Sequence, residues 1–141
     1  MLELAVFDTS YDEWQAVLDY LSANFAIAYS EDGVVLPLPR FEEIRRKRNQ
    51  RTVMLEILLS GLTLNCHFLD DDHIQLNILP EDVDSSEKAD LVFRLMSGLA
   101  NLLNKEVLLV PEFLSASRET LQKLAVCSVA PGTNEIRLRR G

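Results

Sequence analysis

Residues 53–78 read VMLEILLSGLTLNCHFLDDDHIQLNI, a stretch in which apolar and polar side chains alternate between two turn signals. Tight turns at Ser60-Gly61 and at Asp70-Asp71-Asp72 divide it into three antiparallel strands. One face of these strands has only apolar cross-strand rows: Val53/Phe68/Ile74, Leu55/Cys66/Leu76 and Ile57/Leu64/Ile78. The other face has the rows Glu56/Asn65/Asn77 and Met54/His67/Gln75. Because a slip of one residue would exchange the two faces, the sequence predicts a meander in this register with one buried face.

Two helices are predicted to cover the apolar face of this meander. Residues 11–24 follow a capping box, Ser10-Tyr11-Asp12-Glu13, and residues 86–103 follow a cap at Asp84 or Ser85. Both segments repeat apolar residues at helical spacing, with Trp14, Leu18 and Leu21 in the first and Leu95 and Leu99 in the second. We therefore expect one α+β domain over residues 1–141, mainly an antiparallel sheet with the central meander at about 53–78, packed by helices at about 11–24 and 86–103.

The remaining segments extend the predicted sheet. Further strands are expected at residues 2–7, 26–30, 34–38, 106–110 and 135–139. A three-residue loop, Glu31-Asp32-Gly33, should join the second and third of these strands. Pro37 and Pro39 make the latter an edge strand or end it early. Residues 107–110 are apolar without alternation, which indicates a strand covered on both faces. A last helix is expected from Ser115 or Ser117 to Ala125, with Cys127 near its end.

Composition limits the classes of partner. The 141 residues suffice for one domain, and a net charge of −8 disfavours binding to nucleic acid or to an anionic membrane. No apolar run approaches the roughly 18 residues that would cross a bilayer. The first residues lack a basic segment typical of an export signal, so we expect a cytoplasmic protein whose two cysteines are buried and reduced.

No motif indicates catalysis, a cofactor or a metal. Cys66 and His67 are neighbours in the sequence and are of the residue types that form a nucleophile–base pair. Neighbouring side chains on a strand point to opposite faces, however, so these two cannot form one. His67, Asp70, Asp71, Asp72 and His73 lack the spacing of a known metal motif. We therefore expect a protein that is not an enzyme and has no cofactor.

Residues 40–51 hold six of the 14 Lys and Arg residues. Phe41 and Ile44 give this segment a narrow apolar side, which predicts a short exposed helix between two strands. Glu42 and Glu43 precede Arg46 and Lys47 by one turn and can pair with them. No aromatic interleaving or second basic patch accompanies the segment, so it is interpreted as a solvated, partly neutralised face.

The candidate binding surface is the polar side of the meander with its acidic loop. Its candidate partner-binding residues are Glu56, Asn65, His67, Asn77, Asp71 and Asp72. Residues 70–90 contain eight Asp and Glu residues against one lysine, Lys88. Complementary charge speeds encounter and fixes register, so this surface favours a protein partner with a basic surface. The alternative interpretation is an ordinary solvated sheet face and loop.

Two segments share a further pattern: HIQLNILPEDV at residues 73–83 and FRLMSGLANLLNKEVLLVPE at residues 93–112. The pattern is a strand ending in a Pro-acid turn, then a helix, then a strand finishing in Glu. It resembles that of small acidic bacterial immunity proteins, which bind and neutralise a cognate toxin. The resemblance covers about residues 65–112 and implies a protein that neutralises a toxin partner, without identifying its binding residues.

Other functions remain open at this point. A chaperone of a secreted effector would hold its partner unfolded, whereas an immunity protein binds a folded toxin. An enzyme or small-ligand protein would need a deep pocket lined by His67 and carboxylates. A structural subunit would show an apolar homodimer interface, and homo-oligomerisation stays open as well.

Overall fold

The computed structural model describes residues 2–111, 126–132 and 136–138 of the chain. Within these residues, the strands form one antiparallel sheet in the order β3-β2-β4-β5-β6-β1-β7-β8-β9. The strands are β1 (Leu2–Phe7), β2 (Ala26–Glu31), β3 (Val34–Leu36), β4 (Val53–Leu59), β5 (Leu62–Cys66), β6 (His73–Ile78), β7 (Val107–Pro111), β8 (Cys127–Val129) and β9 (Ile136–Leu138). The helices are α1 (Tyr11–Asn24), α2 (Phe41–Lys47), the 3-10 helix η1 (Pro80–Asp82) and α3 (Ser86–Leu103).

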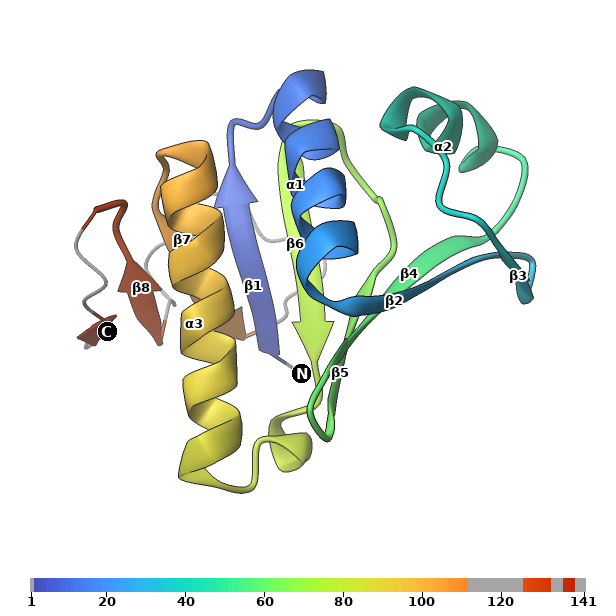
Figure 1. Ribbon diagram of the computed structural model, residues 1–141. Helices are drawn as coiled ribbons and strands as arrows, with labels where there is room; N and C mark the ends of the chain where they lie inside the picture. The colour runs from blue at the N-terminus through green and yellow to red at the C-terminus, as the bar shows by residue number, and fades with distance from the viewer. Residues whose placement is uncertain (1, 112–125, 133–135, 139–141) are drawn as a thin grey trace.

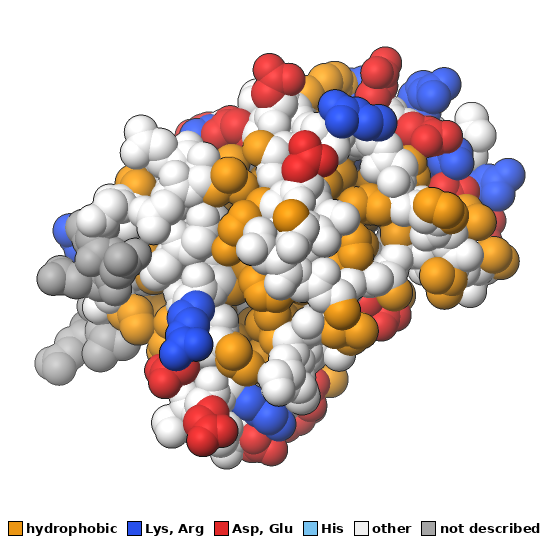
Figure 2. Space-filling view, in the orientation of Figure 1, with side chains coloured by type: hydrophobic (Ala, Val, Ile, Leu, Met, Phe, Trp, Pro, Cys, Tyr) orange, Lys and Arg blue, Asp and Glu red, His pale blue; other side chains and the backbone are white. Residues whose placement is uncertain are grey.

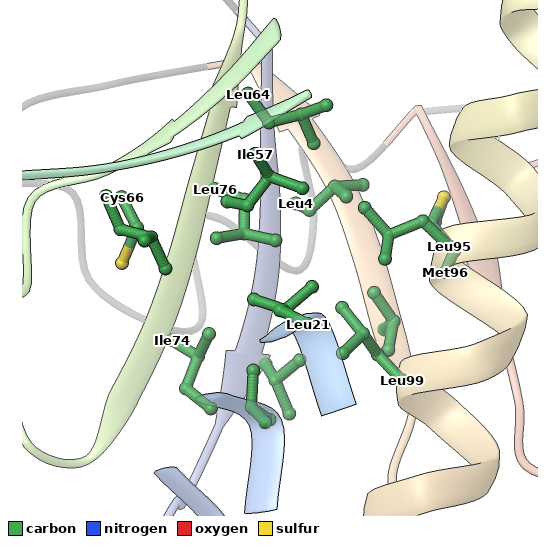
Figure 3. Close-up of a cluster of buried hydrophobic side chains, with 14 of the residues drawn as sticks. Leu4, Leu21, Ile57, Leu64, Cys66, Ile74, Leu76, Leu95, Met96 and Leu99 are labelled. Atoms are coloured by element: carbon green, nitrogen blue, oxygen red, sulfur yellow. The ribbon is translucent and has the colours of Figure 1, made fainter. Parts of the chain in front are cut away.

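Helices α1 and α3 lie on one face of the sheet, and α2 lies beside α1 near the β3 end (Figure 1). The main core fills the space between these helices and the sheet. Figure 3 shows its central side chains converging from both layers: Leu4, Leu21, Ile57, Leu64, Cys66, Ile74, Leu76, Leu95, Met96 and Leu99. The predicted α+β architecture, with two helices packed on an antiparallel sheet, is confirmed.

The meander has the predicted register. Leu59 pairs with Leu62 across the Ser60-Gly61 turn, and Asn65 pairs with Asn77 between β5 and β6. Along β4 and β5 the apolar side chains face the core and the polar ones face away from it, as their alternating burial shows. The alternation in the sequence therefore determines both the pairing and the choice of buried face. The predicted row Met54/His67/Gln75 is not formed, because β5 ends at Cys66.

The predicted Val53–Phe68 pair is wrong, because β5 ends at Cys66. Phe68 has a φ of 54°, which turns the chain out of the strand. Its side chain is nevertheless buried, and its ring centroid lies 5.5 Å from that of Trp14. Packing against α1 stabilises a backbone conformation that is unfavourable for an aromatic residue.

The helix ends follow the sequence signals. Ser10 and Glu13 form the predicted capping box, and the Ser85 side chain accepts a hydrogen bond from the Lys88 amide. Asn104 ends α3 in the left-handed conformation with φ 53°. Phe41 of α2 stacks on Trp14 with ring centroids 4.9 Å apart, which attaches the short basic helix to the core.

The β2–β3 hairpin differs from the expectation in its loop. Glu31 pairs with Val34, so the loop has two residues, Asp32 and Gly33, rather than three. Both have positive φ, 51° and 83°, as the two-residue turn that matches strand twist requires. The predicted loop was too long because Asp can adopt this conformation, which leaves Glu31 in the strand.

The C-terminal strands complete the sheet beyond β1. β7 is buried along residues 107–110 between β1 and β8, as its continuous apolar run predicts. Cys127 lies in β8, where it pairs with Leu109, so its expected position near a helix end is wrong. An apolar run this short fits either periodicity, and pairing with β7 decides for the strand. The helix expected between Ser115 and Ala125 lies outside the described residues.

Candidate functional site

A polar row crosses the sheet on the face opposite the helices. Glu56, Asn65, Asn77 and Glu3 pair in succession across β4, β5, β6 and β1. Glu56 and Asn65 are half-buried, whereas Asn77 is only 9% exposed and Glu3 only 4% exposed. The polar face is therefore partly accessible at β4 and β5 and closed at β6 and β1. Sequence reasoning missed Glu3, although its alternation with Leu4 was the signal that places it on this face.

Glu3 belongs to a small buried cluster around His73. Glu3 Oε1 lies 3.3 Å from His73 Nε2, and Gln75 Nε2 lies 2.7 Å from His73 Nδ1. The side chains of Glu3 and His73 meet across Ala5, which is fully buried. Because an amide nitrogen only donates, Nδ1 accepts, and the neutral ring carries its proton on Nε2, facing the carboxylate. Phe7 stacks on the His73 ring at 4.5 Å between centroids.

This cluster can orient an imidazole but supplies no nucleophile. The side-chain partners described for the His73 ring are a carboxylate and an amide, together with an aromatic ring. Cys66 points to the opposite face and is buried, and burial raises the pKa of its thiol to about 12. His67 is exposed beyond the end of β5, so the adjacent Cys66 and His67 lie apart as alternation predicted. Within the described residues, no cluster of His, Cys, Asp and Glu has the arrangement of a metal site.

Asp71, one of the candidate binding residues, is occupied by contacts inside the molecule. Its Oδ2 lies 2.7 Å from Arg45 Nε and its Oδ1 lies 2.6 Å from Arg48 Nη2. Burial alone would raise the pKa of Asp71, but hydrogen bonds from Arg45 and Arg48 outweigh it and lower the pKa below its ordinary value. The Asp71 carbonyl also accepts hydrogen bonds from Trp14 Nε1 at 2.7 Å and Thr9 Oγ1 at 3.0 Å. We call this set of contacts the Asp71 clamp.

The Asp71 clamp ties the loop between β5 and β6 to α1 and to α2. It distinguishes Asp71 from Asp72, whose side chain is exposed and whose carbonyl accepts from the Thr9 amide at 3.1 Å. Of the two predicted acids in this loop, Asp72 is thus the one whose carboxylate is presented to solvent.

Other basic side chains of α2 are also paired internally. Lys47 Nζ lies 3.0 Å from Glu31 Oε2 and 3.3 Å from Glu43 Oε1. Glu31 is buried and also accepts a hydrogen bond from the Tyr29 hydroxyl at 2.9 Å. The hydrogen bond from Lys47 is the main cause that lowers the pKa of Glu31, while burial and Glu31 raise the pKa of Tyr29. Much of the basic segment is therefore neutralised within the fold.

His67 lies apart from the polar row, in a shallow hollow of about 330 Å³. The hollow is lined by Arg48, Asn49, Arg51, Thr52, Val53, His67, Phe68 and Leu69. The structure thus brings together Glu56, Asn65 and Asn77 on the sheet. It places His67, Asp71 and Asp72 in the segment between β5 and β6, outside both strands.

The eight acids of residues 70–90 form two separate groups. The loop at 70–72 precedes β6 and the remaining acids follow it, so about 20 Å of strand lies between them. The second group has five acids, and we name three of them, together with an apolar neighbour, the acidic end: Leu79, Glu81, Asp84 and Glu87. All four residues are exposed, and Leu79 is 43% exposed. Acidic side chains gather at the lower end of the molecule in Figure 2, below α3.

Lys88 is the one basic residue in residues 79–90, and its Nζ lies 3.1 Å from Asp84 Oδ1. Asp84 remains largely in solvent, with 64% of its side chain exposed. Unlike Asp71, the acidic end therefore presents carboxylates to solvent next to an exposed leucine. Sequence reasoning included these acids in a larger patch but did not identify Leu79, whose position after the last buried residue of β6 was the available signal.

Comparison of the chain with protein-family models, with curated proteins and with solved structures finds no match. None of the helices in the described ranges is long and apolar enough to cross a membrane.

Proposed function

We propose that this chain is a non-catalytic protein-binding protein whose acidic end docks on a basic surface of its partner. The observation that carries the proposal is the acidic end itself, where the exposed Leu79 is followed along the chain by the exposed Glu81, Asp84 and Glu87. An exposed apolar side chain in a segment with mostly acidic charges is expected to favour a partner surface of opposite charge. The net charge of −8 adds a long-range attraction to any basic partner.

The partner class that we propose is a cognate bacterial toxin, which makes the chain an immunity protein. The resemblance at residues 65–112 supports this, since the acidic end falls within that stretch. Carboxylates of Glu81 and Glu87 would occupy a cationic site on the toxin. A cytoplasmic location fits this role and the two buried, reduced cysteines.

The test is complex formation with the product of the gene adjacent to its own. Wild type is expected to co-purify with that product in folded form and to protect cells against it. A partner held unfolded would indicate an effector chaperone instead. Absence of both a complex and protection contradicts the proposal.

The docking surface is tested with two charge-matched double variants. Glu81→Gln/Glu87→Gln removes two charges at the acidic end, and Asp70→Asn/Asp72→Asn removes two at the other end of β6. The first pair should slow association about fivefold to tenfold at low salt, and the second should leave it near the wild-type rate. Equal effects of the two pairs would show that only net charge matters.

A further inference from the structure

Strand β3 forms one edge of the sheet and exposes three consecutive apolar side chains. Val34 is 60% exposed, Val35 is 71% exposed and Leu36 is 37% exposed. Figure 2 shows hydrophobic side chains gathered at the β3 end of the molecule. Edge strands of monomeric proteins commonly carry a charged residue that prevents pairing with another chain, and β3 has none.

The register of the hairpin fixes which backbone groups of β3 face outward. In a two-residue hairpin the closing pair, here Glu31 and Val34, exchanges both backbone hydrogen bonds. The next residue, Val35, therefore points its N–H and C=O away from β2. The hydrogen bonds on the other side of β2 agree with this assignment. The Asp32 amide donates to the Thr52 carbonyl at 2.8 Å, so the even-numbered backbone groups bond toward β4 and the odd-numbered ones, such as Glu31, bond toward β3.

A second copy of the same strand is the natural complement to this edge. If two β3 strands pair antiparallel about a two-fold axis at Val35, the two Val35 residues face each other with N–H and C=O correctly placed for two mutual hydrogen bonds. The same axis sets Val34 opposite Leu36 of the other copy, so apolar side chains meet on both faces of the joined sheet.

Most of the acidic residues lie outside the segment that carries this edge, which limits the repulsion between two copies there. The chain as a whole repels its copies, but residues 26–53 hold six of the 14 Lys and Arg residues and only four of the 22 Asp and Glu residues. Pairing through β3 keeps the acidic remainder of each copy away from the axis. In the antiparallel arrangement the start of β3 in one copy lies near the end of β3 in the other. The exposed Asp32 of one copy is thereby brought toward the exposed Arg40 of the other.

We propose that two copies of this chain associate through β3, centred on Val35, to form a two-fold dimer with one continuous sheet. Three side chains from each copy bury a small area, so the dimer is weak, with a dissociation constant between about 1 µM and 1 mM. This interface is separate from the acidic end, and each surface can be tested without the other.

Sedimentation velocity of the full chain at concentrations from about 10 µM to 1 mM tests the dimer. Wild type should pass from monomer to dimer over this range, and exchange of the Val35 amide proton should slow as the dimer forms. Val35→Pro removes an N–H that makes no bond within the monomer, since it faces outward, and edge strands accept proline there. Val35→Lys places a charge on the axis. Both variants should weaken association at least about tenfold.

Two controls match these variants. Val35→Thr keeps the shape and the backbone donor, and Leu69→Lys adds the same charge at a residue that is 61% exposed and distant in sequence from β3. Both should dimerise like wild type. A wild type that stays monomeric at the highest concentration overturns the proposal. A dimer that persists unchanged in Val35→Pro and Val35→Lys overturns it too. The proposal is also overturned if β3 pairs with a segment of another protein and not with a second copy of this chain.

Discussion

Gly98 provides a prediction whose sign depends on one contact between α1 and α3. A Cβ built at Gly98 would overlap the hydroxyl oxygen of Tyr20 and lie 3.0 Å from Tyr20 Cζ. This small residue therefore lets α3 approach α1 closely. Tyr20 is itself held by an edge contact with Phe25, at 6.0 Å between ring centroids.

Two opposing terms determine the effect of Gly98→Ala. Replacing glycine by alanine within a helix gains about 1 kcal/mol of helix propensity. Forcing a methyl group into an occupied site costs about 1–3 kcal/mol. We expect the steric cost to exceed the gain, so Gly98→Ala should lower the free energy of unfolding by about 1 kcal/mol. In a Tyr20→Phe background the overlapping oxygen is gone, and the same change should be neutral or stabilising.

Urea denaturation of the four variants of this double-mutant cycle measures the coupling. With a slope of about 2 kcal/mol per molar urea, a change of 1 kcal/mol moves the midpoint by about 0.5 M. The coupling free energy between positions 20 and 98 should be at least about 1 kcal/mol. If Gly98→Ala raises the midpoint equally in both backgrounds, the proposed close approach of α1 and α3 is wrong.

Three further predictions concern the ends of the elements and the buried thiol. At pH 7, Asp71→Asn should lower the thermal midpoint more than Asp72→Asn, because of these two carboxylates only that of Asp71 is paired with guanidinium groups. This pairing holds the pKa of Asp71 in the folded state below its unfolded value of about 3.9. The stabilisation is therefore present above the unfolded pKa and should disappear as the pH falls through the folded pKa. Ser10→Ala should cost about 1 kcal/mol in urea denaturation by removing the capping box, whereas Ser22→Ala on the exposed face of the same helix should be near neutral. Cys66, with its pKa raised to about 12 by burial, should react with a disulfide reagent at pH 8 only after unfolding; fast reaction in the native state would show that β5 opens readily.

The sheet could be predicted where local alternation and turns determine it. The register of β4, β5 and β6 follows from the period-2 pattern and from Ser60-Gly61, both readable within 26 residues of sequence. The helix starts likewise follow from Ser10 and Ser85, since capping is a local interaction. The chain order of the outer strands could not be read in this way, because β1 pairs with both β6 and β7 across long sequence separations.

The candidate site was less predictable because its contacts are not local. The sequence around Asp71 is typical of an acidic turn exposed to solvent, and only the folded chain brings Arg45, Arg48 and Trp14 to it. Glu3 joins the polar row through pairing with Asn77, 74 positions further along the numbered sequence. The acids at 70–90 were treated as one patch because sequence proximity does not show that β6 separates them.

The central claim, that the acidic end binds a toxic partner, is tested most directly by protection of cells that express the product of the adjacent gene. The chain and its variants would be produced at equal levels and the growth of the cells measured. Wild type and Asp70→Asn/Asp72→Asn are predicted to restore growth, while Glu81→Gln/Glu87→Gln with Leu79→Ala should lose protection but remain folded. Full protection by this last variant would contradict the claim that the acidic end is the docking surface.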